Sequence, residues 1–330
     1  MRFKDPIFQS VIAPNIYDRH RRPIIKRLQR KLGAKLIVYT ANPTHPIAHI
    51  MIQDVPLFED LLRSVAGAEK GCLMINSPGG DANAAEKLLT MCRVRFTKGF
   101  SVIVPDYAKS AAAMIALGSD KILMGYLAEL GPIDPQLRTA PPPLPGETIP
   151  ARSFIDGLEI IRKKVQEDGD PVQMYYPMMA QIRPEILARC QSAIDGSREL
   201  AEKWLKKYML KDDPRQAELV AKWLSTGEKY KSHGKVIDFE EAKNVLKLNV
   251  EKIDPNSDLW SDVWELYCRS TQFLQQVGPP VDAKLYESES VSLRMSIQAV
   301  MIRAPRLPAR PPPSQPPQRP TPQPPKSPPQ

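Results

Sequence analysis

The region that constrains this chain most lies between Gly71 and Gly131, where short apolar runs alternate with turn sequences and helix-forming intervals. The first apolar run, Leu73–Asn76, ends at the sequence Ser-Pro-Gly-Gly, which predicts a strand that stops in a tight turn. Ala82–Arg95 then predicts a helix, because its apolar residues recur at helical spacing.

A second strand is predicted over Ser101–Val104. It leads through a sharp turn carrying Ser110 into small apolar residues that are typical of a helix packed tightly against a sheet. A further strand is predicted over Lys121–Met124. A right-handed crossover between two parallel strands brings their carboxyl ends side by side. We therefore expect the Gly79-Gly80 turn and Ser110 to be neighbours in space.

This arrangement has a chemical use. Two glycines allow the backbone to approach a ligand with its N–H groups exposed, and a serine that opens a helix has further N–H groups beside it. Together they form the parts of an oxyanion hole next to a hydroxyl nucleophile. Either motif alone is better explained as a surface turn or a serine helix cap. The order and spacing of both motifs within one βαβ unit favour the catalytic interpretation.

The motifs also resemble a known family. INSPGG and KSAAAMIALGSDKILM are similar to the ClpP/crotonase superfamily, and LGPIDPQ is similar to its SppA-like branch, the serine dehydrogenase proteinase (SDH) family. The resemblance implies an α/β fold with a repeated β-β-α spiral core. It also implies a serine-type peptidase in which Ser110 attacks the scissile carbonyl. The N–H groups of Gly80 and Ala111 would hold the oxyanion, and Gly79 would shape the turn.

The general base is harder to assign. ClpP-like enzymes carry a histidine in the segment that resembles Gly131–Gln136, but this chain has Asp134 there. SppA-like relatives use a lysine further on, where this chain has Arg152, and arginine stays protonated in proteins. The resemblance places the aspartate of the ClpP-like triad just before a closing helix, and the matching position in this chain is His233-Gly234. His233 is therefore the candidate base, with an exposed loop histidine as the plain alternative and Lys163 or Lys164 as other candidate bases.

We expect four segments along the chain. A basic helical segment over 1–34 would dock on the domain or a partner subunit rather than lie on an anionic membrane, because its apolar face is thin. The ClpP/crotonase-like protease domain would span 35–250, and a helical C-terminal extension would span 251–303, with an edge strand or tail from residue 280. The proline-rich residues 304–330 would form a disordered tail, because they contain too little apolar surface to fold.

Composition excludes several classes of protein. The net charge is +9, but four of these charges lie in the tail and the rest form no basic stripe, so we expect no nucleic-acid partner. We expect no transmembrane segment and no signal peptide, because no long apolar run occurs. The four scattered cysteines indicate reduced thiols in a cytoplasmic protein.

No metal and no cofactor are predicted. His45 and His49 lie in a proline-containing loop without further ligands. Neither a phosphate-binding GxxxxGK[ST] motif nor a dinucleotide fingerprint occurs, so ATPase and oxidoreductase chemistry are not expected.

Two rival functions remain at this stage. A catalytically inactive scaffold or peptide-binding subunit is favoured by the missing lysine and the missing histidine at the ClpP position. Crotonase-like acyl-CoA chemistry also uses paired N–H groups, but a serine at the nucleophile position counts against it. The expected partners are a peptide or protein substrate and further copies of the chain, since the small residues of Ala111–Ala116 and the helical arms suit a homo-oligomer.

Overall fold

The computed structural model describes residues 17–138, 148–180, 183–275 and 281–297. The expectations for the first sixteen residues, for most of the proline-rich loop before Thr148 and for the 304–330 tail fall outside these residues. The described residues form a seven-stranded central sheet. Its strands, in the order in which they lie side by side, are β11 (Ser292–Ile297), β10 (Val281–Glu287), β1 (Lys35–Ala41), β2 (Lys70–Asn76), β3 (Gly99–Val104), β5 (Lys121–Met124) and β9 (Val250–Lys252).

Most of this sheet is parallel. β1, β2, β3, β5 and β9 pair in parallel, whereas β10 is antiparallel to β1 and β11 is antiparallel to β10. Parallel strands are covered on both faces and therefore consist of continuous apolar runs. β1 and β2 fit this rule, since every residue after the first is buried in both.

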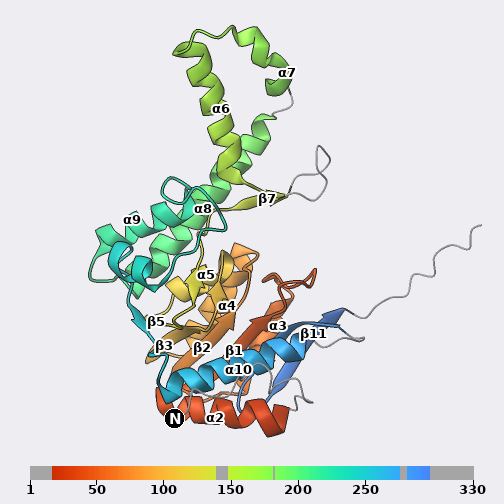
Figure 1. The fold of residues 1–330 in the computed structure, drawn as a ribbon, viewed down its shortest axis with the longest axis vertical. Coiled ribbons are helices and arrows are strands. Elements are labelled where there is room, and N and C mark those ends of the chain that lie inside the picture. The colour runs from red at the N-terminus through yellow and green to blue at the C-terminus, as the bar shows by residue number, and fades with distance from the viewer. Residues whose placement is uncertain (1–16, 139–147, 181–182, 276–280, 298–330) are drawn as a thin grey trace, which may run out of the picture. The chain divides into compact units, whose positions relative to one another are not determined.

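Helices cover the two faces of the sheet (Figure 1). Inward residues of β1–β3 on one face pack in a single cluster with α3 (Asp54–Arg63), α4 (Ala82–Arg95) and α5 (Ala111–Leu117). Residues of the opposite face pack with α2 (Arg22–Leu32) and α10 (Asp258–Leu274). Successive side chains of a strand point to opposite faces of the sheet, so those of β1–β3 are divided between the two helical layers.

The basic N-terminal helix docks on the domain, as one of the two sequence-based alternatives predicted. Ile24, Ile25 and Leu28 of α2 are buried. Arg27 and Lys31 form ion pairs with Asp262 of α10 at 2.8 and 2.7 Å. Its apolar stripe therefore faces the core and its basic residues meet an acidic partner on α10.

A helical region is inserted between β6 (Glu129–Leu130) and β9. Within this region, the second half of α8 (Pro184–Lys207) and all of α9 (Pro214–Ser225) pack onto the same cluster as α5. The remaining elements are short or belong to this insertion: η1 (Tyr17–Arg21), β4 (Tyr107–Ala108), β6 (Glu129–Leu130), β7 (Gln136–Arg138), β8 (Thr148–Pro150), α6 (Ala151–Gln166), η2 (Val172–Tyr175), α7 (Tyr176–Met179), α8 (Pro184–Lys207), α9 (Pro214–Ser225) and η3 (Glu241–Val245).

The C-terminal part of the described chain returns to the sheet. α10 is the helical part of the expected extension, and the segment left open as an edge strand or a tail forms two strands. β10 lies inside the sheet beside β1, and β11 is the edge strand. The pairing of β10 with β1 places Lys284 and Tyr286 in contact with Asp54, the first residue of α3.

Candidate active site

Ser110 lies where β4 turns sharply into α5. Its backbone has φ 48° and ψ −121°, a conformation that costs energy for any residue with a side chain. All seven residues of α5 are buried, so the surrounding structure holds this turn in place. Ser110 occupies the cap position of the helix, yet its side chain makes no capping hydrogen bond. The plain explanation of Ser110 as a helix cap therefore fails.

Gly79 packs directly against this turn. A Cβ atom on Gly79 would lie 2.7 Å from Ser110 Cβ and 2.4 Å from the Lys109 carbonyl oxygen, and Gly79 has a φ of 93°. Only glycine fits these conditions. The structure thus confirms that the glycine turn and Ser110 are neighbours, because β2 and β3 are adjacent parallel strands.

Gly80 is held by a different segment. Ile50 donates its N–H to the Gly79 carbonyl at 2.7 Å and accepts the Asp81 N–H at 2.8 Å. A Cβ on Gly80 would lie 2.3 Å from the Ile50 carbonyl oxygen. Ile50 therefore fixes the outer side of the glycine turn, and the close approach again requires glycine.

Two backbone N–H groups at this junction are free of protein acceptors within the part of the chain that the structure describes. They belong to Gly80 and to Ala111, whereas the neighbouring N–H groups of Gly79 and Ala112 donate to Ser77 Oγ and the Lys109 carbonyl. Ala111 N lies 3.0 Å from a Cβ built on Gly79. An unpaired N–H at the first turn of a helix is available to a ligand, and such donors stabilise negative charge on oxygen.

His233 and Asp134 form a pair. His233 Nδ1 lies 2.8 Å from Asp134 Oδ1. The other carboxylate oxygen accepts a hydrogen bond from Gln136 at 2.9 Å, and Asp134 is only 4% exposed. An ionised carboxylate only accepts hydrogen bonds, so in the neutral imidazole this contact places the proton on Nδ1 and leaves the lone pair on Nε2. This tautomer is the one that a general base needs.

Three short segments bring this pair towards the nucleophile. β4 precedes Ser110 and pairs in parallel with β6, which precedes Asp134. β6 in turn exchanges two backbone hydrogen bonds with Ile237, four residues after His233: Leu130 N donates at 2.9 Å and Ile237 N donates at 3.1 Å. The three candidate groups therefore extend from three aligned segments.

Lys109 links the same three segments. Its ammonium forms an ion pair with Glu129 at 2.7 Å and donates to the carbonyls of Leu130 at 3.3 Å and Lys235 at 3.4 Å. No hydrogen bond joins Ser110 Oγ to His233 among the described residues. Catalytic hydrogen bonds often tighten only when substrate is bound, so this separation is compatible with a base role.

The other candidate bases lie in unsuitable surroundings. Lys164 is in the last turn of α6 and forms an ion pair with Asp168 at 3.0 Å. The hydrogen bond from Asp168 raises the pKa of Lys164, whereas a lysine base needs a lowered pKa. Arg152 is bound to Asp156 at 2.7 Å. Lys163 is exposed on the same helix.

Within the described residues, no group of three or more histidine, cysteine or acidic side chains has a metal-binding arrangement. The four cysteines are free and buried. Among the described helices, none combines the length and apolar character that crossing a membrane requires.

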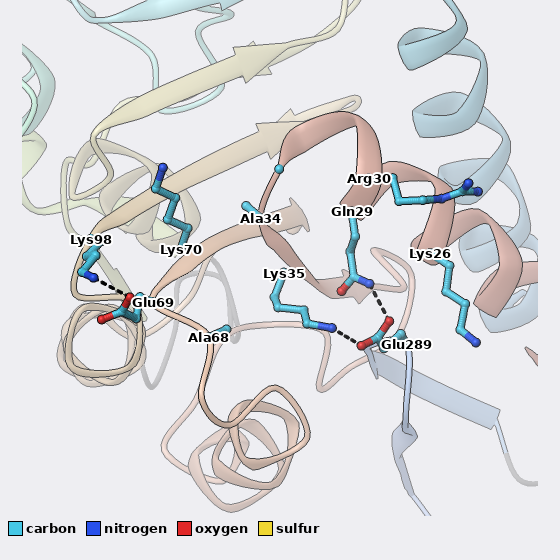
Figure 2. A pocket seen from close by; sticks show the side chains of 11 residues that line it. Lys26, Gln29, Arg30, Ala34, Lys35, Ala68, Glu69, Lys70, Lys98 and Glu289 are labelled. Atoms are coloured by element: carbon cyan, nitrogen blue, oxygen red, sulfur yellow. Dashed lines mark hydrogen bonds and ion pairs between the residues drawn. The ribbon is translucent and has the colours of Figure 1, made fainter.

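A pocket of about 860 Å³ lies at the opposite end of the sheet, around the first residues of β1 and β2. Figure 2 shows that its basic side chains do not converge: Lys26 and Arg30 extend from one side, while Lys70 and Lys98 lie across the pocket. Lys98 is also paired with Glu69 at 2.6 Å. Ser110 is not among the described residues that line this pocket.

Comparison with known proteins gives a family. The family described as ClpP-like SDH-type serine proteinase matches residues 7–283, a range that contains Ser110, Asp134 and His233. Two uncharacterized proteins of Methanocaldococcus jannaschii, MJ0137 and MJ1495, are 31% identical over 147 residues and 30% identical over 152 residues. Each alignment covers 41% of this chain, which spans about half the length of these curated relatives (51% and 50%).

Similar solved structures include two proteases. A lysine-to-alanine variant of the 1510-N membrane-bound stomatin-specific protease, in complex with a substrate peptide, has 19% identity and a TM-score of 0.37, covering 67% of this chain and 76% of that chain. An asparagine-to-aspartate variant of ClpP1 from Listeria monocytogenes has 16% identity and a TM-score of 0.32, covering 71% of this chain and 99% of that chain.

Asp134 lies in the segment where the family resemblance led us to expect a histidine, and no role was predicted for it from the sequence. A signal was present: this chain has an aspartate where ClpP-like enzymes have the histidine, and a histidine where they have the aspartate. Ile50 carried no signal, because its role depends on backbone hydrogen bonds rather than on its side chain.

Proposed function

Since the chain belongs to the ClpP-like SDH-type serine proteinase family, we propose that it hydrolyses peptide bonds with Ser110 as nucleophile, His233 as general base and Asp134 as the group that orients the histidine. The observation that carries this proposal is the 2.8 Å contact between His233 Nδ1 and Asp134 Oδ1, on segments aligned with the one that bears Ser110. A serine, histidine and aspartate act as a triad through geometry, whatever their order in the chain.

The proposed reaction has two stages. Ser110 Oγ attacks the carbonyl carbon of the peptide bond while His233 Nε2 takes the hydroxyl proton, and Asp134 stabilises the resulting imidazolium. The N–H groups of Gly80 and Ala111 hold the negatively charged oxygen of the tetrahedral intermediate. His233 then gives its proton to the leaving amine, and an acyl ester remains on Ser110. Water, activated by His233 in the same way, hydrolyses this ester.

A fluorophosphonate probe tests this function, because it forms a stable bond with an activated serine. We expect one adduct, located on Ser110 by peptide mass spectrometry and absent in Ser110→Ala. A folded protein that gives no adduct and hydrolyses no peptide would instead support the scaffold or peptide-binding alternative. Hydrolysis of acyl-CoA without peptide hydrolysis would support the crotonase-like alternative.

We further propose that the protein acts as a homo-oligomer on peptide or protein substrates in the cytoplasm. Several large apolar side chains of the helical insertion are exposed, among them Ile160, Met174, Tyr176 and Met178 at 55–65%. An assembly of several copies would remove such side chains from water. The free, buried cysteines fit a reducing compartment. A monomer in light scattering would contradict the oligomer.

A further inference from the structure

A fully buried charged cluster lies beneath the loop that holds Gly80. Asp54, the first residue of α3, is 0% exposed, and so is Lys284 of β10. Lys284 Nζ lies 2.6 Å from Asp54 Oδ1. Two tyrosine hydroxyls donate to the same carboxylate, that of Tyr286 at 2.9 Å and that of Tyr39 at 3.1 Å. We name this cluster the Asp54 network; its members are Asp54, Lys284, Tyr39 and Tyr286.

The Asp54 network reaches the glycine turn through the backbone. Asp54 Oδ2 accepts the Met51 N–H at 3.1 Å, which closes the turn immediately after Ile50. Ile50 makes the two backbone hydrogen bonds to Gly79 and Asp81 that enclose Gly80. The network thus contacts the loop that encloses the glycine turn.

Stability alone does not account for this arrangement. Removing two charges from water costs about as much as their attraction returns, and apolar residues of the same volume are often equally stable. A buried carboxylate with four fixed donors does, however, specify one geometry, because any displacement of Met51 or either tyrosine leaves a buried group unpaired.

We propose that the Asp54 network positions the oxyanion hole by fixing Ile50 against Gly79 and Gly80, so that the Gly80 N–H is directed at the reacting carbonyl. The inference rests on the proposed peptidase function for its catalytic consequence. Its members are positioning residues, since none of them would touch the substrate. Because Lys284 and Tyr286 belong to β10, the oxyanion hole depends on β10 as well as on the motifs around Ser110.

The chain offers a matched control for the test. Glu287, also on β10, is 0% exposed and forms a second buried ion pair, with Arg21 at 2.8 Å. Glu287→Gln and Asp54→Asn therefore both replace a buried carboxylate by an amide. Of the two carboxylates, Asp54 contacts the loop that contains Ile50, through the Met51 N–H. Tyr286→Phe removes one hydroxyl and serves as a second variant if Asp54→Asn or Lys284→Met fails to fold.

Two readouts separate the inference from the proposed function. The first is amide hydrogen exchange of peptides covering residues 47–53 and 77–82, which requires no activity. We expect exchange there to accelerate about tenfold or more in Asp54→Asn, Lys284→Met and Tyr286→Phe, but not in Glu287→Gln. The second is peptide hydrolysis, where kcat should fall about tenfold or more with KM unchanged, since loss of one oxyanion donor costs about 10²–10³ in kcat.

Exchange that stays at the wild-type rate in both peptides, or that rises equally in Glu287→Gln, would overturn the inference. An unchanged kcat in folded Asp54 network variants of an active enzyme would overturn it as well. If wild-type protein neither reacts with the fluorophosphonate nor cleaves peptides, the proposed function fails, while the exchange result still decides whether the network fixes the turn.

Discussion

His233 Nδ1 lies 2.8 Å from Asp134 Oδ1, although 99 residues separate the two along the chain. The contact forms because β6 aligns with the segment that follows His233 on one side and with β4, which leads to Ser110, on the other. The contact with Asp134 gives His233 a fixed orientation, and its side chain remains 28% exposed.

Replacing either member of this pair should slow catalysis. We expect His233→Ala to lower kcat by about 10²–10⁴-fold, the usual contribution of a positioned general base. Asp134→Asn should cause a similar loss, because an amide can favour the wrong tautomer of the histidine. Lys164→Met is the control, and its kcat should match wild type. A loss of activity in Lys164→Met with none in His233→Ala would assign the base to Lys164.

Adding one methyl group to the glycine turn should abolish activity. A Cβ on Gly80 would lie 2.3 Å from the Ile50 carbonyl oxygen, so in Gly80→Ala the turn and its N–H must move. The matched control is Gly33→Ala: Gly33 also has a positive φ, 62°, but apart from its chain neighbours no atom of the described residues lies within 4 Å of its added Cβ. That control should cost only about 1–2 kcal/mol of stability and leave kcat unchanged. Equal activity in the two variants would contradict the role of the turn.

Lys109 should couple the three site segments. Lys109→Met keeps the length of the side chain but removes the ion pair to Glu129 and the contacts to the carbonyls of Leu130 and Lys235. We expect kcat to fall and hydrogen exchange of residues 230–237 to rise. Lys121→Met, which removes an exposed ion pair with Glu251, is the control. Unchanged exchange over 230–237 would show that Lys109 does not hold the histidine loop.

Stability should fall at alkaline pH because of the buried thiols. Burial raises the pKa of Cys72 from its ordinary 9.0 to about 12. The unfolded chain loses this proton first, so stability is complete below pH 9 and falls as the pH rises towards 12. At about pH 10 the Cys72 thiol should lower the free energy of unfolding by about 1.4 kcal/mol, compared with its value well below pH 9. Urea unfolding of wild type and Cys72→Ala at about pH 8 and pH 10 checks this, and equal pH dependence in both would contradict it.

Much of the core followed from local patterns. The helix predicted over Ala82–Arg95 and the strand predicted over Lys121–Met124 have the observed bounds, because apolar spacing and turn residues agree there. The nearness of Gly79 and Ser110 followed from the handedness of the crossover between parallel strands.

Long-range pairing explains what the sequence did not reveal. β10 pairs with β1, and its Lys284 and Tyr286 contact Asp54, at least 230 positions away in the sequence; no local pattern encodes such contacts. The partnership of Asp134 with His233 likewise depends on two short backbone alignments. These contacts join polar side chains, so the spacing of apolar residues does not predict them.

The rate at which a fluorophosphonate labels Ser110 in wild type, His233→Ala and Asp134→Asn tests most directly whether these three residues act as a triad. We expect a single adduct on Ser110 of the wild-type protein and labelling that is slower by about 10²-fold or more in both variants. Ser110→Ala should not react, and Lys164→Met should react like wild type. Labelling of Ser110 at the wild-type rate in His233→Ala, or no adduct on folded wild-type protein, would contradict a triad of Ser110, His233 and Asp134.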